Sequence, residues 1–153
     1  MKRVKGGIKI VAGQLDSGTY QGVENKIQLF DGKFTTGYRV VRFVITDSQP
    51  LGSYEAMATL STEPKSTIGY WNFGDIQEIA WAGWQNPAPS NGSDDFTLVR
   101  EGNMLIQDLW INAYSSSDNR VINYYIELEK YEFTAWDGAG EMVRNNAQAG
   151  PGT

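Results

Sequence analysis

Alternation between apolar and polar side chains is the feature that most constrains the fold of this chain. In the segment 120–133, Ile126 and Leu128 fall on one side of an extended strand, and Glu127 and Glu129 fall on the other. A period of two residues indicates a β-strand, because successive side chains of a strand point to opposite faces. The same period marks eight strand-like segments, at 7–13, 25–30, 37–46, 54–61, 76–83, 95–100, 103–113 and 120–133.

These segments predict an all-β fold, an antiparallel two-sheet sandwich. Turn residues separate them, and 153 residues suffice for one domain with its own core. A jelly roll is the leading topology, because eight strands in two sheets suit this length, while immunoglobulin-like and barrel arrangements remain as alternatives. The dipeptide Asp31-Gly32 predicts a tight type I′ hairpin.

One short C-terminal helix is expected in TAWDGAGEMVRNNAQ, with Thr134 as its N-cap. The sandwich domain is expected to span residues 1–148, and residues 149–153 form a tail.

The composition excludes several kinds of chemistry. The chain has no cysteine and no histidine, which excludes disulfides, zinc–thiolate sites, thiol nucleophiles and the Ser-His-Asp triad. The net charge is −5 without a basic cluster, so nucleic acid is not an expected partner. No segment approaches the roughly 20 apolar residues of a transmembrane helix, and no signal-peptide core is present. We therefore expect no membrane partner, no metal and no cofactor.

The hexapeptide ELEKYE, residues 127–132, allows two interpretations. It is similar to the E-x-D-x-x-E signature of the laminarinase-like retaining β-glucanases, which are jelly-roll glycosidases. The resemblance implies Glu127 as nucleophile, Glu132 as acid/base and Glu129 in place of the helper aspartate, with carboxyl groups about 5–5.5 Å apart. Ordinary alternation instead explains Glu127 and Glu129 as the solvated face of a strand. The second interpretation favours a protein that is not an enzyme.

Two strand-like segments, 38–45 and 104–114, carry apolar residues on both faces. Each sheet of a free-standing sandwich needs only one apolar face, so the C-terminal helix and long loops, or another chain, are expected to cover the second. The candidate residues for an interface with another chain are Val41, Phe43, Met104, Ile106 and Trp110.

The aromatic segment 70–84 supports an alternative function, that of a carbohydrate-binding module. Trp71, Trp81 and Trp84 could stack on sugar rings, and many such modules are jelly rolls. Because Trp81 and Trp84 are three residues apart, a flat platform would require the strand to bend at Gly83. Tryptophan is also commonly half-buried in cores and interfaces.

The segment DLWINAYSSSDNRVINYYIELEKYEF, residues 108–133, and the following AGEMVRNNAQ resemble small β-rich structural proteins of tailed bacteriophages, particularly marine and cyanobacterial ones. In that resemblance 108–133 is a long hairpin followed by a short helix. It implies a head decoration, cement or minor virion protein, present as an oligomer and in contact with capsid or other virion proteins. The implied location is the virion, assembled in the host cytoplasm without signal-peptide secretion.

Overall fold

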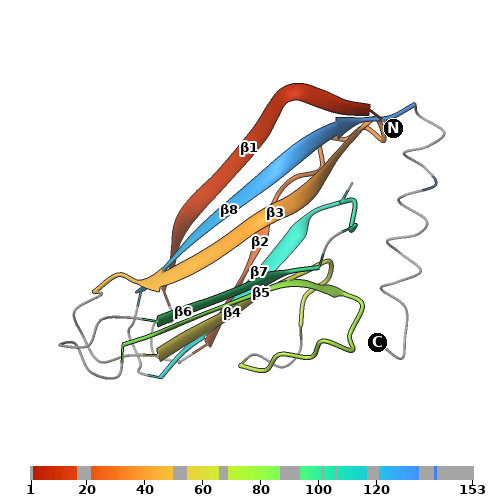
Figure 1. Cartoon of the computed structure of the whole chain (residues 1–153). Helices are drawn as coiled ribbons and strands as arrows, with labels where there is room; N and C mark the ends of the chain where they lie inside the picture. Colours follow the sequence, from red (N-terminus) through yellow and green to blue (C-terminus); the bar gives the residue numbers. More distant parts are fainter. Residues whose placement is uncertain are drawn as a thin grey trace.

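The computed structural model is a sandwich of two antiparallel β-sheets (Figure 1). It describes residues 2–16, 22–49, 55–65, 69–86, 94–100, 102–105, 107–116, 121–134 and 140. The strands are β1 (Lys2–Asp16), β2 (Gly22–Ile27), β3 (Thr36–Asp47), β4 (Glu55–Ser61), β5 (Glu78–Gln85), β6 (Asp94–Val99), β7 (Leu109–Ser115) and β8 (Val121–Glu132). Each segment with a two-residue period overlaps one of these strands, so the predicted all-β, two-sheet fold is confirmed.

The strand order is β1-β8-β3 in a three-stranded sheet and β2-β7-β4-β5-β6 in a five-stranded sheet. In a jelly roll, antiparallel pairs are nested, first strand with last and second with second-last, and the whole is rolled into two sheets. Here β1 pairs with β8, β2 with β7 and β4 with β5. The remaining nested pair is replaced, because β6 pairs with β5 instead of β3. The topology is therefore that of a jelly roll in which one strand has changed sheets.

Two connections that were expected to be hairpins pass from one sheet to the other. Asp31-Gly32 lies between β2 and β3, and the segment 108–133 contains β7 and β8; the strands of each pair belong to different sheets. Gly32 has a φ of 84°, so a tight bend is present there. Both hairpin predictions were wrong because the rolled topology pairs strands that are distant in sequence. The expected helix after Thr134 and the tail 149–153 lie outside the described residues, apart from Gly140.

The main core fills the space between the sheets. Trp84 of β5 and Phe43 of β3 are among its buried residues, with aliphatic side chains from β1, β2, β4, β7 and β8. A smaller cluster contains Met104, Tyr131 and Phe133. It packs beside Gly37, where an added Cβ would lie 2.5 Å from the Phe133 ring. A glycine at this position therefore lets the smaller cluster approach the backbone of β3.

An irregularity at Val41 decides which residues of β3 face the core. The pairing with β8 passes from Val40 to Arg42, so Val41 has no partner and the alternation shifts by one residue. Val40 and Phe43 are consequently both buried, while Val41 is exposed. Because Val41 and Phe43 are two residues apart, the period of two predicts that they share a face; this prediction was wrong because a bulge changes the parity of a strand.

Candidate functional site

The face of the five-stranded sheet that points away from the core carries the connection between β4 and β5, residues 62–77, which we call the β4–β5 loop (Figure 1). The indole N–H of Trp71 donates to the carbonyl of Ala58 in β4 at 3.2 Å. A Cβ on Gly83 of β5 would lie 3.1 Å from the Trp71 ring, and a Cβ on Gly69 would lie 3.2 Å from the Tyr114 ring. The described parts of the loop therefore lie directly on the sheet.

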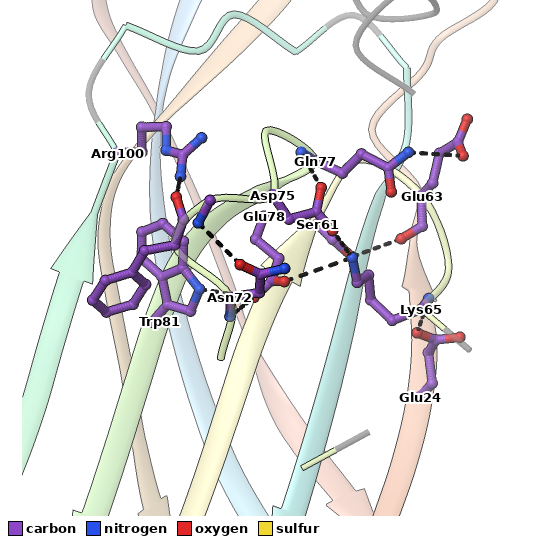
Figure 2. A network of polar contacts seen from close by, with 12 residues as sticks. Glu24, Ser61, Glu63, Lys65, Asn72, Asp75, Gln77, Glu78, Trp81 and Arg100 are labelled. Carbon is purple, nitrogen blue, oxygen red and sulfur yellow. Dashed lines mark hydrogen bonds and ion pairs between the residues drawn. The ribbon is translucent and has the colours of Figure 1, made fainter. Parts of the chain in front are cut away.

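A buried polar network holds the β4–β5 loop in place (Figure 2). The Lys65 ammonium donates to Asp75 and lies 3.6 Å from Oε2 of Glu78. Oε1 of Glu78 accepts hydrogen bonds from the Trp81 indole at 2.9 Å and from the Asn72 backbone N–H at 3.1 Å. Burial alone would raise the pKa of Asp75, but hydrogen bonds from Lys65 and a backbone N–H, with nearby positive charge, hold it below its ordinary value.

The outer end of the loop is fixed by aromatic and arginine contacts. The Phe73 ring lies 4.5 Å from the Trp81 ring, centroid to centroid. Arg100 donates to the Phe73 carbonyl at 2.6 Å, and its guanidinium lies 5.3 Å from the Trp81 ring. Trp81 is thus enclosed between its own strand and the loop.

An open cleft of about 590 Å³ lies beside the loop. Its floor includes one cross-strand row formed by Tyr114, Met57, Gly83 and Phe96. Trp71 forms a wall, with its ring 5.2 Å from that of Phe96. The polar lining residues are Glu55, Gln85, Asp95 and Ser116. Aromatic faces beside carboxylate and amide groups suit a ligand that has both C–H surface and hydroxyl groups.

The three tryptophans of the predicted sugar platform do not lie on one surface. Trp71 is 37% exposed and lines the cleft, whereas Trp81 is 2% exposed beneath Phe73 and Trp84 is 4% exposed in the main core. The strand continues through Gly83, which pairs with β4 and with β6, so no bend brings Trp81 and Trp84 together. A platform made of all three was therefore wrong, and only Trp71 presents a broad ring surface.

A contiguous set of exposed apolar side chains extends from the loop onto β6; we call Trp71, Phe73, Phe96 and Leu98 the aromatic surface. Phe96 and Leu98 are two apart on β6 and share a face. Trp71 contacts Phe96, and Phe73 contacts Trp81, the cross-strand partner of Leu98. Because β6 is the edge strand of its sheet, this surface continues to the sheet edge.

The outward face of the three-stranded sheet combines exposed Ile8 and Ile10 of β1 with polar side chains of β8, because Ile8 pairs with Glu129 and Ile10 with Glu127. The Tyr125 hydroxyl donates to Glu127 at 3.1 Å, and Arg42 lies 3.8 Å from the same carboxylate. One step along, the Tyr131 hydroxyl donates to Glu129 at 2.9 Å. The hydrogen bond to Glu127 raises the pKa of Tyr125. Glu127 therefore has a cross-strand partner in Arg42 of β3, and Glu129 bonds to Tyr131, a member of the smaller cluster.

The glycosidase geometry is absent from β8. Its pairing with β3 shows no extra residue in β8 between Glu127 and Glu132, so these two side chains point to opposite faces. Five residues of strand also separate them by about 16–17 Å along its axis. The assignment of Glu127 and Glu132 as a catalytic pair was wrong because an unbroken strand cannot bring such positions within about 5.5 Å.

The five predicted interface residues are dispersed. Phe43 is fully buried in the main core, and Met104 is buried in the smaller cluster. Val41 is exposed on β3, and Trp110 is half-buried on β7, where Lys26 lies 6.0 Å from its ring. Ile106 lies outside the described residues. The second face of β7 is covered in part by the β4–β5 loop, because Gly69 lies against the Tyr114 ring.

Sequence reasoning missed Asp108, which interrupts the segment expected to be a strand from residue 103. Its carboxylate accepts the backbone N–H groups of Leu29 and Phe30 at 2.8 and 2.9 Å and contacts Lys26 at 3.0 Å. Burial alone would raise the pKa of Asp108, but these donors hold it below its ordinary value. Only its position ahead of an apolar run hinted at an anchoring role.

Comparisons with protein-family models, curated proteins and solved structures find no match to this chain. Within the described ranges, no group of three or more acidic, histidine or cysteine residues could hold a metal ion. In the same part of the chain, no helix has the length and apolar character needed to cross a membrane.

Proposed function

We propose that this chain is a non-enzymatic structural protein of a phage virion, a head decoration, cement or minor component. It works through contacts with copies of itself and with capsid or other virion proteins. The aromatic surface carries the proposal, because soluble proteins rarely leave contiguous apolar side chains exposed unless another molecule covers them. The jelly-roll strand order adds support, since viral capsid domains commonly use it.

The edge position of β6 strengthens the expectation of a protein partner. An edge strand with outward Phe96 and Leu98 presents both apolar side chains and a row of backbone groups. Such an edge pairs readily with another chain unless charges or bulges protect it. We expect the partner to lie against β6 and the neighbouring Trp71.

Association is tested by size-exclusion chromatography with light scattering on the full chain. We expect a defined oligomer for the wild type and a lower mass for Leu98→Lys, because a charge is placed in the covered surface. Gln14→Lys is the matched control, since Gln14 is a polar, exposed residue on β1 of the other sheet. A wild-type monomer at every soluble concentration would contradict the oligomer, and absence of the chain from purified phage particles would contradict the virion role.

The cleft favours a second candidate function, glycan binding. A sugar ring presents weakly positive C–H groups to the negative face of an aromatic ring, and its hydroxyls donate to carboxylates. Trp71 supplies the ring, and Glu55 and Asp95 supply carboxylates at the polar end of the cleft. Its volume is within the range typical of small-molecule sites, about 300–1,000 Å³.

Tryptophan fluorescence separates the two candidates. We expect oligosaccharides to change the emission of the wild type much more than that of Trp71→Phe, because Trp71 exposes 37% of its surface at the cleft, whereas Trp84 lines the cleft but is only 4% exposed. Leu98→Lys is the complementary variant, expected to weaken association and keep the sugar response. No response across a broad panel of glycans would remove this function without affecting the structural one.

A further inference from the structure

A lysine and two carboxylates meet beneath the β4–β5 loop (Figure 2). Lys65 Nζ is in direct contact with Oδ2 of Asp75 and lies 3.6 Å from Oε2 of Glu78. The side chains of Asp75 and Glu78 are each 3% exposed, and that of Lys65 is 18% exposed. An amine, an acyl carbon and a second carboxylate are therefore enclosed together.

Each carboxylate is held through one oxygen and offers the other to Lys65. Oδ1 of Asp75 accepts the Gln77 backbone N–H at 2.9 Å, so its Oδ2 faces the amine. Oε1 of Glu78 is held by the Trp81 indole and the Asn72 backbone N–H, so its Oε2 faces the amine. The contact is thus oriented as well as close, which distinguishes it from a mobile surface ion pair.

We propose that Lys65 and Asp75 form an intramolecular amide bond, with Glu78 as the proton carrier. Glu78 takes a proton from the Lys65 ammonium and passes it to Oδ2 of Asp75, so that the neutral amine attacks Cγ of a neutral carboxyl group. The Gln77 N–H stabilises charge developing on Oδ1. The C–Oδ2 bond then breaks, and Oδ2 leaves as water with the two protons that nitrogen loses, one of them carried by Glu78. Glu78 returns the proton it carries, and no oxidant or co-reactant is consumed.

Proximity supplies the driving advantage for this step. Groups held in reactive contact behave as if present at effective concentrations of about 10⁵–10⁸ M, which far exceeds any intermolecular encounter. The lowered pKa of Asp75 means that the ion pair predominates before reaction. The ammonium–carboxylate pair already contains the atoms of the amide and one water, so the step needs only proton transfers and the exchange of one C–O bond for a C–N bond.

Intact-mass spectrometry of the aged, purified chain tests the proposal. We expect a species lighter than the sequence mass by one water. Trypsin should then fail to cleave after Lys65 and should release residues 43–100 as one fragment lacking one water. A succinimide at Asp31-Gly32 would also remove one water, but it would leave cleavage at Lys65 intact. Full mass and ordinary cleavage at Lys65 would show an ion pair only and would overturn the proposal.

Variants assign the roles. Lys65→Arg keeps the positive charge and removes the nucleophile, so the mass should return to that calculated from the sequence. Glu78→Gln keeps acceptors for the Trp81 and Asn72 N–H groups and should slow the water loss at least tenfold. The Lys26–Asp108 pair, at 3.0 Å, is the internal control, because no other ion pair to either residue is present in the described part of the chain. Water loss at the Lys26–Asp108 pair as well would show that Glu78 is not needed for the reaction.

Discussion

The outward faces of the two sheets accommodate polar side chains in different ways. The three-stranded sheet leaves Glu127 and Arg42 in a solvated network, whereas the five-stranded sheet buries Glu78 and Trp81 under a loop. Polar residues on an open face exchange hydrogen bonds with water for weak interactions with neighbouring side chains, so each contributes little to the free energy of unfolding. Polar residues on a covered face have lost their hydrogen bonds to water, so the loss of any protein partner leaves a buried polar group unsatisfied. The location of a charge, more than its identity, therefore determines how much the fold depends on it.

Removal of Trp81 should give the largest difference between the faces. Trp81→Ala eliminates contacts with Phe73 and the hydrogen bond to Glu78, and we expect a loss of about 3–5 kcal/mol in the free energy of unfolding. Tyr125→Ala on the open face should cost less than about 1 kcal/mol. Urea titration followed by circular dichroism measures both. Similar losses in the two variants would break the comparison.

At the margin of the covered face, Asp108→Ala should have an intermediate effect. The substitution leaves the N–H groups of Leu29 and Phe30 without their acceptor. We expect a loss of about 2–3 kcal/mol, since an unsatisfied buried donor costs about 1–3 kcal/mol. Lys26→Ala removes the ion pair and keeps those two hydrogen bonds, so it should cost under about 1 kcal/mol in the same titration.

Acid should weaken the covered face through its carboxylates. In the freshly prepared chain, before an amide forms at Asp75, Asp75 and Asp108 have folded-state pKa values below the ordinary 3.8, so the stability they confer is present above that pH and is lost as the pH falls through their folded values. We expect the free energy of unfolding to fall below about pH 4. Asp108→Asn should reduce the slope of the free energy of unfolding against pH in this range. An unchanged slope would show that Asp108 does not contribute to it.

The smallest effect is expected at Arg42, whose side chain is 60% exposed. Arg42→Ala should change the free energy of unfolding by no more than about 0.5 kcal/mol. Glu127→Gln should bring the pKa of Tyr125 back towards its ordinary value, because the charged acceptor is removed. Spectrophotometric titration of tyrosine measures that shift; a larger stability loss at Arg42 than at Asp108 would reverse the ranking.

Local periodicity was sufficient to locate the strands, because the alternation of apolar and polar residues lies within each strand and does not depend on its partner. It placed Glu127 and Glu129 on a solvated face, which the structure bears out. It could not assign Phe43, since a single unpaired residue at Val41 inverts every later position of β3. Bulges depend on the partner strand, and the partner of β3 is β8, far away in sequence.

The covered face was harder to foresee for the same reason. Trp71 was identified from composition, but the burial of Trp81 and Trp84 depends on the loop and on the opposite sheet. The meeting of Lys65 with Asp75 and Glu78 depends on the path of the β4–β5 loop, which has no periodic signal. Side-chain clusters that depend on the path of an irregular loop are therefore the hardest part of such a protein to predict from its sequence.

Pairing between β1 and β8 also dictates when the three-stranded sheet can form. Its first strand, Lys2–Asp16, leaves the ribosome well before Val121–Glu132, so β1 waits without a neighbour through most of synthesis. Folds that depend on such distant pairing assemble slowly, and their unpaired strands attract other nascent chains. Ile8 and Ile10 add exposed apolar surface to β1 while that strand is unpaired.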